Sequence, residues 1–145
     1  MSKSFDDLIS KVSGCGMKKV AVAVAQDSAV LEAVAAAKER KIAEAILVGD
    51  ADKIKEVAAQ INMDLNGFEI IDEKDDYAAA LKAVELVHNG KADMYMKGLI
   101  DTKSFLKSVL DKEVGLRTGK TLSHVCVFEI KGIDHLLFLT DVAFM

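Results

Sequence analysis

The residues best suited to chemistry lie where an apolar run gives way to a helical pattern, in the range 94–110. Lys97 and Gly98 follow the apolar run, and Thr102 stands where the helical pattern begins. A lysine supplies positive charge, the free N–H groups of a helix start attract negative charge, and a glycine lets a backbone approach a ligand. This turn therefore has the parts of an anion site, although helix capping alone would also explain Asp101 and Thr102.

A second group of polar residues occupies the segment 115–124. Arg117 offers a planar fork of donors that matches phosphate, while Thr118 and Ser123 add neutral hydroxyl groups. The spacing is not that of a Walker A phosphate loop, which argues against a P-loop ATPase. Residue types alone leave a second interpretation open, a mobile surface loop with incidental charge.

Five further residues carry reactive or titratable groups. His124 and Cys126 lie two apart on a strand-like run and share a face, as a catalytic pair or as part of a packed core. We expect His88 to interact with the carboxyl end of its own helix. Asp141 either orients a partner group or caps whatever follows it. Cys15 and Cys126 form no disulfide framework and match no metal-site spacing, so no metal is expected.

The elements that must position these groups alternate between strand and helix patterns. Apolar runs typical of strands buried on both faces occur at 20–25, 45–49, 68–72 and 92–96. In the first run we expect valines on one side and alanines on the other. Helical patterns follow the strands, and three of them can be capped by one of two residues: Asp27 or Ser28, Asp50 or Asp52, and Asp75 or Asp76.

Four further expectations concern the opening helix, the end of one later helix, the inward face of another and the last two strands. An amphipathic helix opens the chain with Phe5 and Val12 on one face, and Asn89-Gly90 ends the third of the helices that follow strands. The helix after Thr102 points four residues inward, namely Phe105, Leu106, Val109 and Leu110. The runs 123–130 and 135–141 flank the turn-like sequence KGID and predict an antiparallel hairpin added to the parallel sheet.

Four strand–helix pairs imply parallel strands with right-handed crossovers. The predicted fold class is therefore α/β, a parallel sheet with helices on both faces in three α/β/α layers, plus the antiparallel hairpin at the end.

Composition limits the class of function. The chain has 145 residues, of which 51% are hydrophobic and 29% charged, as expected for one soluble globular domain. Its net charge of −4 argues against a general nucleic-acid binder. Residues 97–120 nevertheless carry six cations against three acids, which suits a small polyanion or is simply a solvated helix face. With neither a signal peptide nor an apolar run that could span a membrane, we expect a cytoplasmic protein.

Four stretches of the sequence together resemble the phosphate acetyl/butyryl transferase family: KKVAVAVAQD, AILVGD, ADMYMKGLIDTKSFLKSVLDKEVGLRTGKTLSHVCVFEI and LLFLTDVAF. The resemblance runs from about Phe5 to Phe144. It implies transfer of a butyryl or other short acyl group between coenzyme A and inorganic phosphate, with coenzyme A as substrate and no bound cofactor. It also implies catalytic roles for Arg117 and Ser123 and phosphate or substrate binding by four residues, Lys97, Gly98, Thr102 and Thr118.

Family members are about twice this length, with two α/β domains and an active cleft between them. We therefore expect residues 1–145 to form a single α/β domain, the amino-terminal part of a two-domain acyltransferase that is incomplete in this chain. The expected partners are acyl-CoA, phosphate and further copies of the chain in a homo-oligomer, but no nucleic acid and no membrane.

Three alternatives remain beside this interpretation. One is a phosphate acetyltransferase, since acyl-chain length depends on a pocket that the sequence does not delimit. Another is a non-catalytic α/β module that binds an anion or a nucleotide. A response-regulator receiver is the weakest, because the first strand ends in Gln26-Asp27 without the acidic cluster that would hold magnesium.

Overall fold

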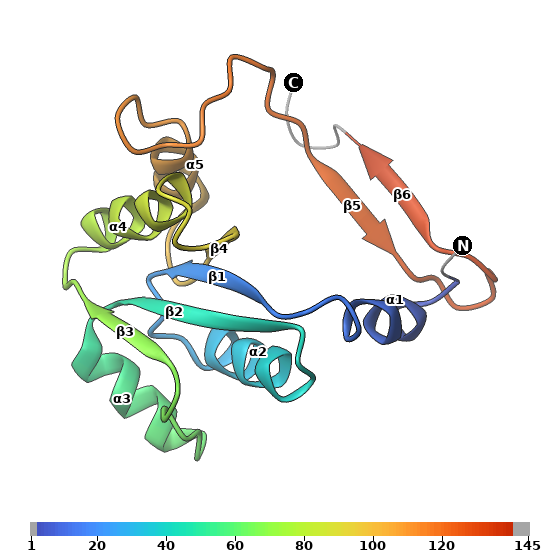
Figure 1. Ribbon diagram of the computed structural model, residues 1–145, viewed down its shortest axis with the longest axis horizontal. Helices are drawn as coiled ribbons and strands as arrows, with labels where there is room; N and C mark the ends of the chain where they lie inside the picture. Colours follow the sequence, from blue (N-terminus) through green and yellow to red (C-terminus); the bar gives the residue numbers. More distant parts are fainter. Residues whose placement is uncertain (1–2, 141–145) are drawn as a thin grey trace. The chain divides into compact units, whose positions relative to one another are not determined.

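The computed structural model of this chain describes residues 3–140. Two compact units divide the chain (Figure 1). Met17–Arg117 form the first, hereafter the core unit, and Met1–Gly16 with Thr118–Met145 form the second, hereafter the hairpin unit. Among residues 3–140, no helix has both the length and the apolar character needed to cross a membrane.

Strands and helices alternate along the core unit in the order β1 (Lys18–Ala23), α2 (Ser28–Glu39), β2 (Ala43–Gly49), α3 (Ala51–Gln60), β3 (Glu69–Asp72), α4 (Asp76–His88), β4 (Met94–Lys97) and α5 (Thr102–Val109). The strands form one parallel sheet in the order β3-β2-β1-β4. From β1 the chain moves outward to β2 and β3, and β4 then returns to the other side of β1.

Buried apolar side chains cover both faces of this sheet. On one face Val22 of β1 joins Leu31 of α2 and Ile54 of α3 in a single cluster. On the other face, alanines of β1 pack with alanines of α4, namely Ala21, Ala23, Ala79, Ala80 and Ala83. Figure 1 shows α2 and α3 on one side of the sheet and α4 and α5 on the other. The predicted parallel α/β/α layering is confirmed, as is the separation of valines from alanines over residues 20–23.

That separation reverses at Val24. Val24 lies in the buried cluster of the alanine face, and Ala25 lies in the cluster of the valine face. The cause is a left-handed backbone at Val24, whose φ is 58°, directly after β1 ends at Ala23. Such a conformation is unusual for a β-branched residue, so it is held by the packing around it.

Aspartates begin all four helices of the core unit. The side chains of Asp27, Asp50, Asp75 and Asp101 each accept a hydrogen bond from a backbone N–H in the following turn. The first-named residue of each predicted capping pair is therefore the cap. Helix α4 ends at Asn89 as predicted, and Gly90 follows with a φ of 71° and donates from its N–H to the Val87 carbonyl.

The hairpin unit contains helix α1 (Phe5–Val12) and strands β5 (Val125–Phe128) and β6 (Leu137–Thr140). Ser4 caps α1, and the Phe5 N–H donates to the Glu129 carboxylate over 2.8 Å. The two strands pair antiparallel, which confirms the predicted hairpin. They form a two-stranded sheet of their own, however, so the expectation that the hairpin adds to the parallel sheet is wrong. The apolar pattern predicts strands but does not determine which strands are neighbours.

Candidate functional site

The β4–α5 turn lies at the carboxyl edge of the parallel sheet, beside the end of β1. Ala23, the last residue of β1, is paired in register with Lys97, the last residue of β4. The direction of strand succession reverses here, because β2 and β3 lie on the opposite side of β1. In open parallel sheets ligands bind at the carboxyl ends of the strands where the strand order reverses. The turn singled out in the sequence therefore occupies the position at which this type of fold binds ligands.

Positive charge at this turn comes from Lys97. Lys97 and Thr102 are exposed, and within residues 3–140 neither side chain takes part in a hydrogen bond or an ion pair. Asp101 caps α5, accepting from the Ser104 N–H at 2.9 Å. The Ser104 hydroxyl, followed by that N–H, holds the pKa of Asp101 below its usual value. Because this carboxylate stays ionised at the helix start, an anion near the turn needs positive charge beside it, and Lys97 is one source of that charge.

Gly98 makes its close approach to the protein itself. A Cβ at this position would lie 2.3 Å from the Val24 carbonyl oxygen and 2.4 Å from that of Ala23. The Gly98 N–H donates to the Ala23 carbonyl at 2.9 Å, and the Leu99 N–H donates to the Val24 carbonyl at 2.7 Å. The glycine thus packs the β4–α5 turn against the end of β1, and its predicted contact with a ligand stays a prediction.

Within the core unit, a polar contact that the sequence pattern did not indicate holds helix α5 against β4 and α4. Ser108 is fully buried, and its hydroxyl lies 2.9 Å from the Tyr95 hydroxyl, which in turn donates to the Ala80 carbonyl. Burial raises the pKa of Tyr95 to about 12, so the phenol stays neutral and able to donate. Phe105 stacks on Tyr95 with ring centroids 4.5 Å apart.

The inward face of α5 differs from the prediction at one residue. Leu110 is 49% exposed, whereas Phe105, Leu106 and Val109 are half-buried. Leu110 is the cap residue that follows the helix rather than part of its last turn, and this explains why it leaves the buried face. Ser108 takes an inward position instead.

Hydrogen bonds within the core unit hold the segment 111–116, which precedes Arg117. The Asp111 carboxylate accepts from the N–H groups of Glu113 and Val114, which lower its pKa. The Leu116 N–H donates to the Val109 carbonyl at 2.8 Å. Arg117 follows directly; its side chain is exposed and has no hydrogen-bond or ion-pair partner within residues 3–140.

His88 contributes to this anchoring. Its Nδ1 lies 2.8 Å from the Gly115 carbonyl oxygen, to which it donates. His88 lies in the last turn of α4, where its ring also contacts the later segment 111–116; its predicted interaction with the carboxyl end of its own helix stays a prediction. Arg117 therefore extends from a fixed turn, unlike an arginine in a mobile loop.

The other predicted site residues belong to the hairpin unit. Thr118 and Ser123 are exposed. His124 and Cys126 are half-buried, with Sγ 3.4 Å from the imidazole Nε2. Asp141 lies outside the described residues. Thus Lys97, Gly98, Thr102 and Arg117 share one unit, while Thr118 and Ser123 lie in the other, and the convergence of the two loops stays a prediction.

Three residues near the carboxyl edge were missed in the sequence. The Gln26 Oε1, just after β1, is buried and has no hydrogen-bond partner within residues 3–140. It lies against Gly49, where a Cβ would come within 2.1 Å of it. Lys53 and Lys74 line a cavity of about 500 Å³ together with Leu99 and Asp101. Lys53 contacts Asp50 at 3.6 Å and Lys74 contacts Asp52 at 3.9 Å, so both lysines lie beside the acids that follow β2. The Asp50–Lys53 spacing could have indicated the first of these pairs.

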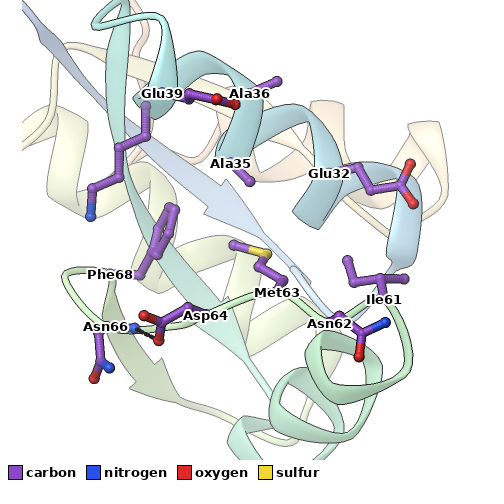
Figure 2. A pocket seen from close by; sticks show the side chains of 11 residues that line it. Glu32, Ala35, Ala36, Glu39, Ile61, Asn62, Met63, Asp64, Asn66 and Phe68 are labelled. Carbon is purple, nitrogen blue, oxygen red and sulfur yellow. Dashed lines mark hydrogen bonds between the residues drawn. The ribbon is translucent and has the colours of Figure 1, made fainter.

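A cavity of about 530 Å³ lies away from this edge (Figure 2). It is bounded by residues 32–39 of α2 and by the segment between α3 and β3, which places it near the amino ends of the strands. Figure 2 shows Glu32 and Glu39 of α2 beside it, with Asp64 on the opposite wall. Lys38 also lines the cavity, but its ammonium group donates to the Gly67 carbonyl and lies over the Phe68 ring, so the three carboxylates dominate and disfavour an anion. The described part of the chain also contains no group of three or more His, Cys, Asp or Glu side chains placed to hold a metal ion.

Comparison with known proteins gives consistent matches. The family described as Phosphate acetyl/butaryl transferase matches residues 4–80 and 77–145. The chain is 65% identical over 144 residues to the phosphate butyryltransferase of Clostridium acetobutylicum and 61% identical over 144 residues to that of Clostridium beijerinckii. Each match covers 99% of this chain and 48% of the relative, so the chain spans about half the length of these relatives.

A solved structure of a phosphotransacylase is also similar to this chain. The branched-chain phosphotransacylase from Enterococcus faecalis V583 superimposes with a TM-score of 0.70 at 28% identity. That match covers 89% of this chain and 44% of the other.

Proposed function

Because this chain belongs to the phosphate acetyl/butyryl transferase family, we propose that it forms the phosphate- and coenzyme-facing part of a short-chain acyltransferase. In the proposed reaction butyryl-CoA and phosphate give butyryl phosphate and coenzyme A. A phosphate oxygen attacks the thioester carbonyl carbon, and negative charge develops on the carbonyl oxygen. The tetrahedral intermediate then breaks its C–S bond, and the departing thiolate takes up a proton.

The proposed roles follow from charge and exposure. Lys97, with Gly98 and Thr102, holds an anionic group of a substrate at the carboxyl edge of the sheet. Arg117 presents its guanidinium fork to phosphate or to the developing oxyanion, where a fixed donor is most effective. Thr118 and Ser123 supply hydroxyl groups, the latter in a catalytic role. The single observation that carries the proposal is the family match over both 4–80 and 77–145. The position of Lys97 agrees with it, since this side chain has no partner within residues 3–140 and lies where strand order reverses.

The remaining parts of the proposal concern the whole protein. The chain is the amino-terminal part of a two-domain enzyme, and residues beyond it complete the active cleft. Coenzyme A is a substrate and no bound cofactor takes part. The protein is cytoplasmic and forms a homo-oligomer. Identities of 65% and 61% to phosphate butyryltransferases favour butyryl over acetyl transfer, and phosphate acetyl transfer is the alternative that the family description also covers.

Activity of the isolated chain tests this proposal. We expect the 145-residue chain to bind phosphate or coenzyme A weakly and to show little or no phosphate-dependent release of coenzyme A from butyryl-CoA, because the second wall of the cleft is lacking. Continuing the chain after Met145 with the unmatched part of the Clostridium acetobutylicum relative gives a longer protein, hereafter the fused enzyme, in which we expect release to be restored. Release is measured with a thiol reagent.

The control is the same assay without phosphate, which separates transfer from hydrolysis. Robust phosphate-dependent release by a mass-verified 145-residue sample would contradict the proposed division of the enzyme. A folded fused enzyme that releases no coenzyme A would contradict the function itself.

A further inference from the structure

Leu99 exposes a large apolar side chain at the carboxyl edge of the sheet. It is 55% exposed, more than the other exposed large apolar side chains of the core unit, which are Met17, Met94 and Leu110. Those three lie before β1, at the start of β4 and after the end of α5. Of the four, only Leu99 follows the carboxyl end of a strand. Because a single exposed leucine is ordinary on a protein surface, the informative feature is its position.

The backbone of Leu99 is fixed, whereas its side chain stays outside the core. The Leu99 N–H donates to the Val24 carbonyl at 2.7 Å, and the next residue, Ile100, lies in the buried cluster of the alanine face. Leu99 belongs to neither of the two buried clusters of the core unit. Packing of the core unit therefore does not require a large apolar side chain at this position, although the turn holds one there.

Leu99 lines the cavity of about 500 Å³ at this edge, beside the buried Ile100 and the half-buried Tyr77. The charged side chains around the same cavity are two lysines and three aspartates, namely Lys53, Lys74, Asp75, Asp76 and Asp101. Because the acids outnumber the cations, the cavity does not favour an anion. Its apolar wall of Leu99, Ile100 and Tyr77 suits an uncharged group that carries hydrocarbon.

The proposed reaction places such a group close to Lys97. A phosphate oxygen forms a bond to the acyl carbon, so the acyl chain begins where phosphate is bound. Lys97 precedes Leu99 by two residues, and two residues of extended chain span at most about 7 Å. With phosphate at Lys97, a butyryl chain reaches Leu99, whereas the methyl group of an acetyl substrate stays near the reacting carbon.

We propose that Leu99 contacts the acyl chain of the substrate and sets the preference of the enzyme for butyryl over acetyl groups. This inference rests on the proposed function, with phosphate as the anion at Lys97. The cavity that Leu99 lines with Tyr77 and Ile100 receives the chain as it extends from the reacting carbon. A methylene group in contact with an apolar pocket changes kcat/KM by roughly tenfold or more.

The ratio of kcat/KM for butyryl-CoA to kcat/KM for acetyl-CoA in the fused enzyme tests the proposal. Leu99→Ala should lower this ratio about tenfold, because the longer chain loses more contact than the shorter one. Leu99→Met should keep the ratio within about twofold of the unsubstituted enzyme, since methionine is apolar and of similar volume. Urea unfolding followed by circular dichroism checks that each variant folds.

Leu110→Ala is the matched control. Leu110 is also an exposed leucine of the core unit, at 49%, and it does not line the cavity. We expect both values of kcat/KM to be unchanged in this variant. An unchanged ratio in Leu99→Ala would overturn the proposal. An equal loss with both thioesters would overturn it as well, because Leu99 would then contact a part that the two substrates share.

A folded fused enzyme that releases no coenzyme A from either thioester contradicts the proposed function. Binding then decides the role of Leu99 separately. With butyryl-CoA added to the fused enzyme, we expect a nuclear Overhauser effect between the methyl groups of Leu99 and the terminal methyl group of the butyryl chain. Absence of this effect, whether or not butyryl-CoA binds elsewhere, would overturn the proposal.

Discussion

Replacing Arg117 by alanine in the fused enzyme is expected to lower kcat/KM for acyl transfer roughly a hundredfold, as loss of one positioned donor to a developing oxyanion does. Arg117 is exposed and unpartnered within residues 3–140, and it follows a turn fixed by Asp111 and His88. A guanidinium held in this way loses little freedom when it binds phosphate. Steady-state release of coenzyme A from butyryl-CoA gives the measurement.

Arg40→Ala is the matched control for this prediction. Arg40 is also exposed, but it lies at the carboxyl end of α2, away from the carboxyl edge of the sheet. It should leave kcat/KM unchanged, and Arg117→Lys should recover only part of the loss, because a lysine cannot form two parallel hydrogen bonds to phosphate. Unchanged kinetics in Arg117→Ala would mean that this arginine is merely solvated.

Gly98→Ala is expected to lower the free energy of unfolding of the core unit by about 3 kcal/mol, near the upper end for an overpacked site. The added Cβ would meet two backbone carbonyl oxygens, those of Ala23 and Val24, and neither can move without disturbing the end of β1. Urea unfolding of the 145-residue chain, followed by circular dichroism, gives the measurement.

Gly14→Ala separates this steric effect from the general effect of replacing a glycine. Its nearest contact would be the Lys11 carbonyl at 3.8 Å, and neither Gly14 nor Gly98 has a positive φ. We expect unfolding of the core unit to be unchanged in Gly14→Ala. A stable Gly98→Ala chain that loses only phosphate or coenzyme binding would instead support the ligand role predicted from the sequence.

Local patterns were sufficient to predict most of the core unit. The apolar runs, the caps Asp27, Asp50 and Asp75, and the stop at Asn89-Gly90 each depend on residues within one turn or one strand. Apolar character on both faces of the strands correctly indicated helices on both sides of the sheet. Because all strands of a parallel sheet end at one edge, the pattern that predicts a strand ending at Lys97 also predicts its place at the carboxyl edge.

The features that could not be predicted depend on contacts between distant residues. Gly98 is required by the backbone of Val24, which lies far away in the sequence, and the left-handed Val24 has no local signal. Ser108 is buried on the inward face of α5 because the Tyr95 hydroxyl lies opposite it, and Leu110 leaves that face because it is the cap residue after the helix. The contact of the His88 ring with the Gly115 carbonyl joins residues 27 positions apart and has no local signal. The sequence pattern of the hairpin, likewise, did not reveal that its sheet is separate.

The most direct test of the central claim measures the Michaelis constants for phosphate and for butyryl-CoA separately in the fused enzyme carrying Lys97→Ala, Arg117→Ala or both. If the two cations bind one anionic group, both single variants weaken the same substrate, and the double variant loses less than the product of the two single losses. The claim is contradicted if Lys97→Ala affects one substrate and Arg117→Ala only the other, or if the two losses multiply in full.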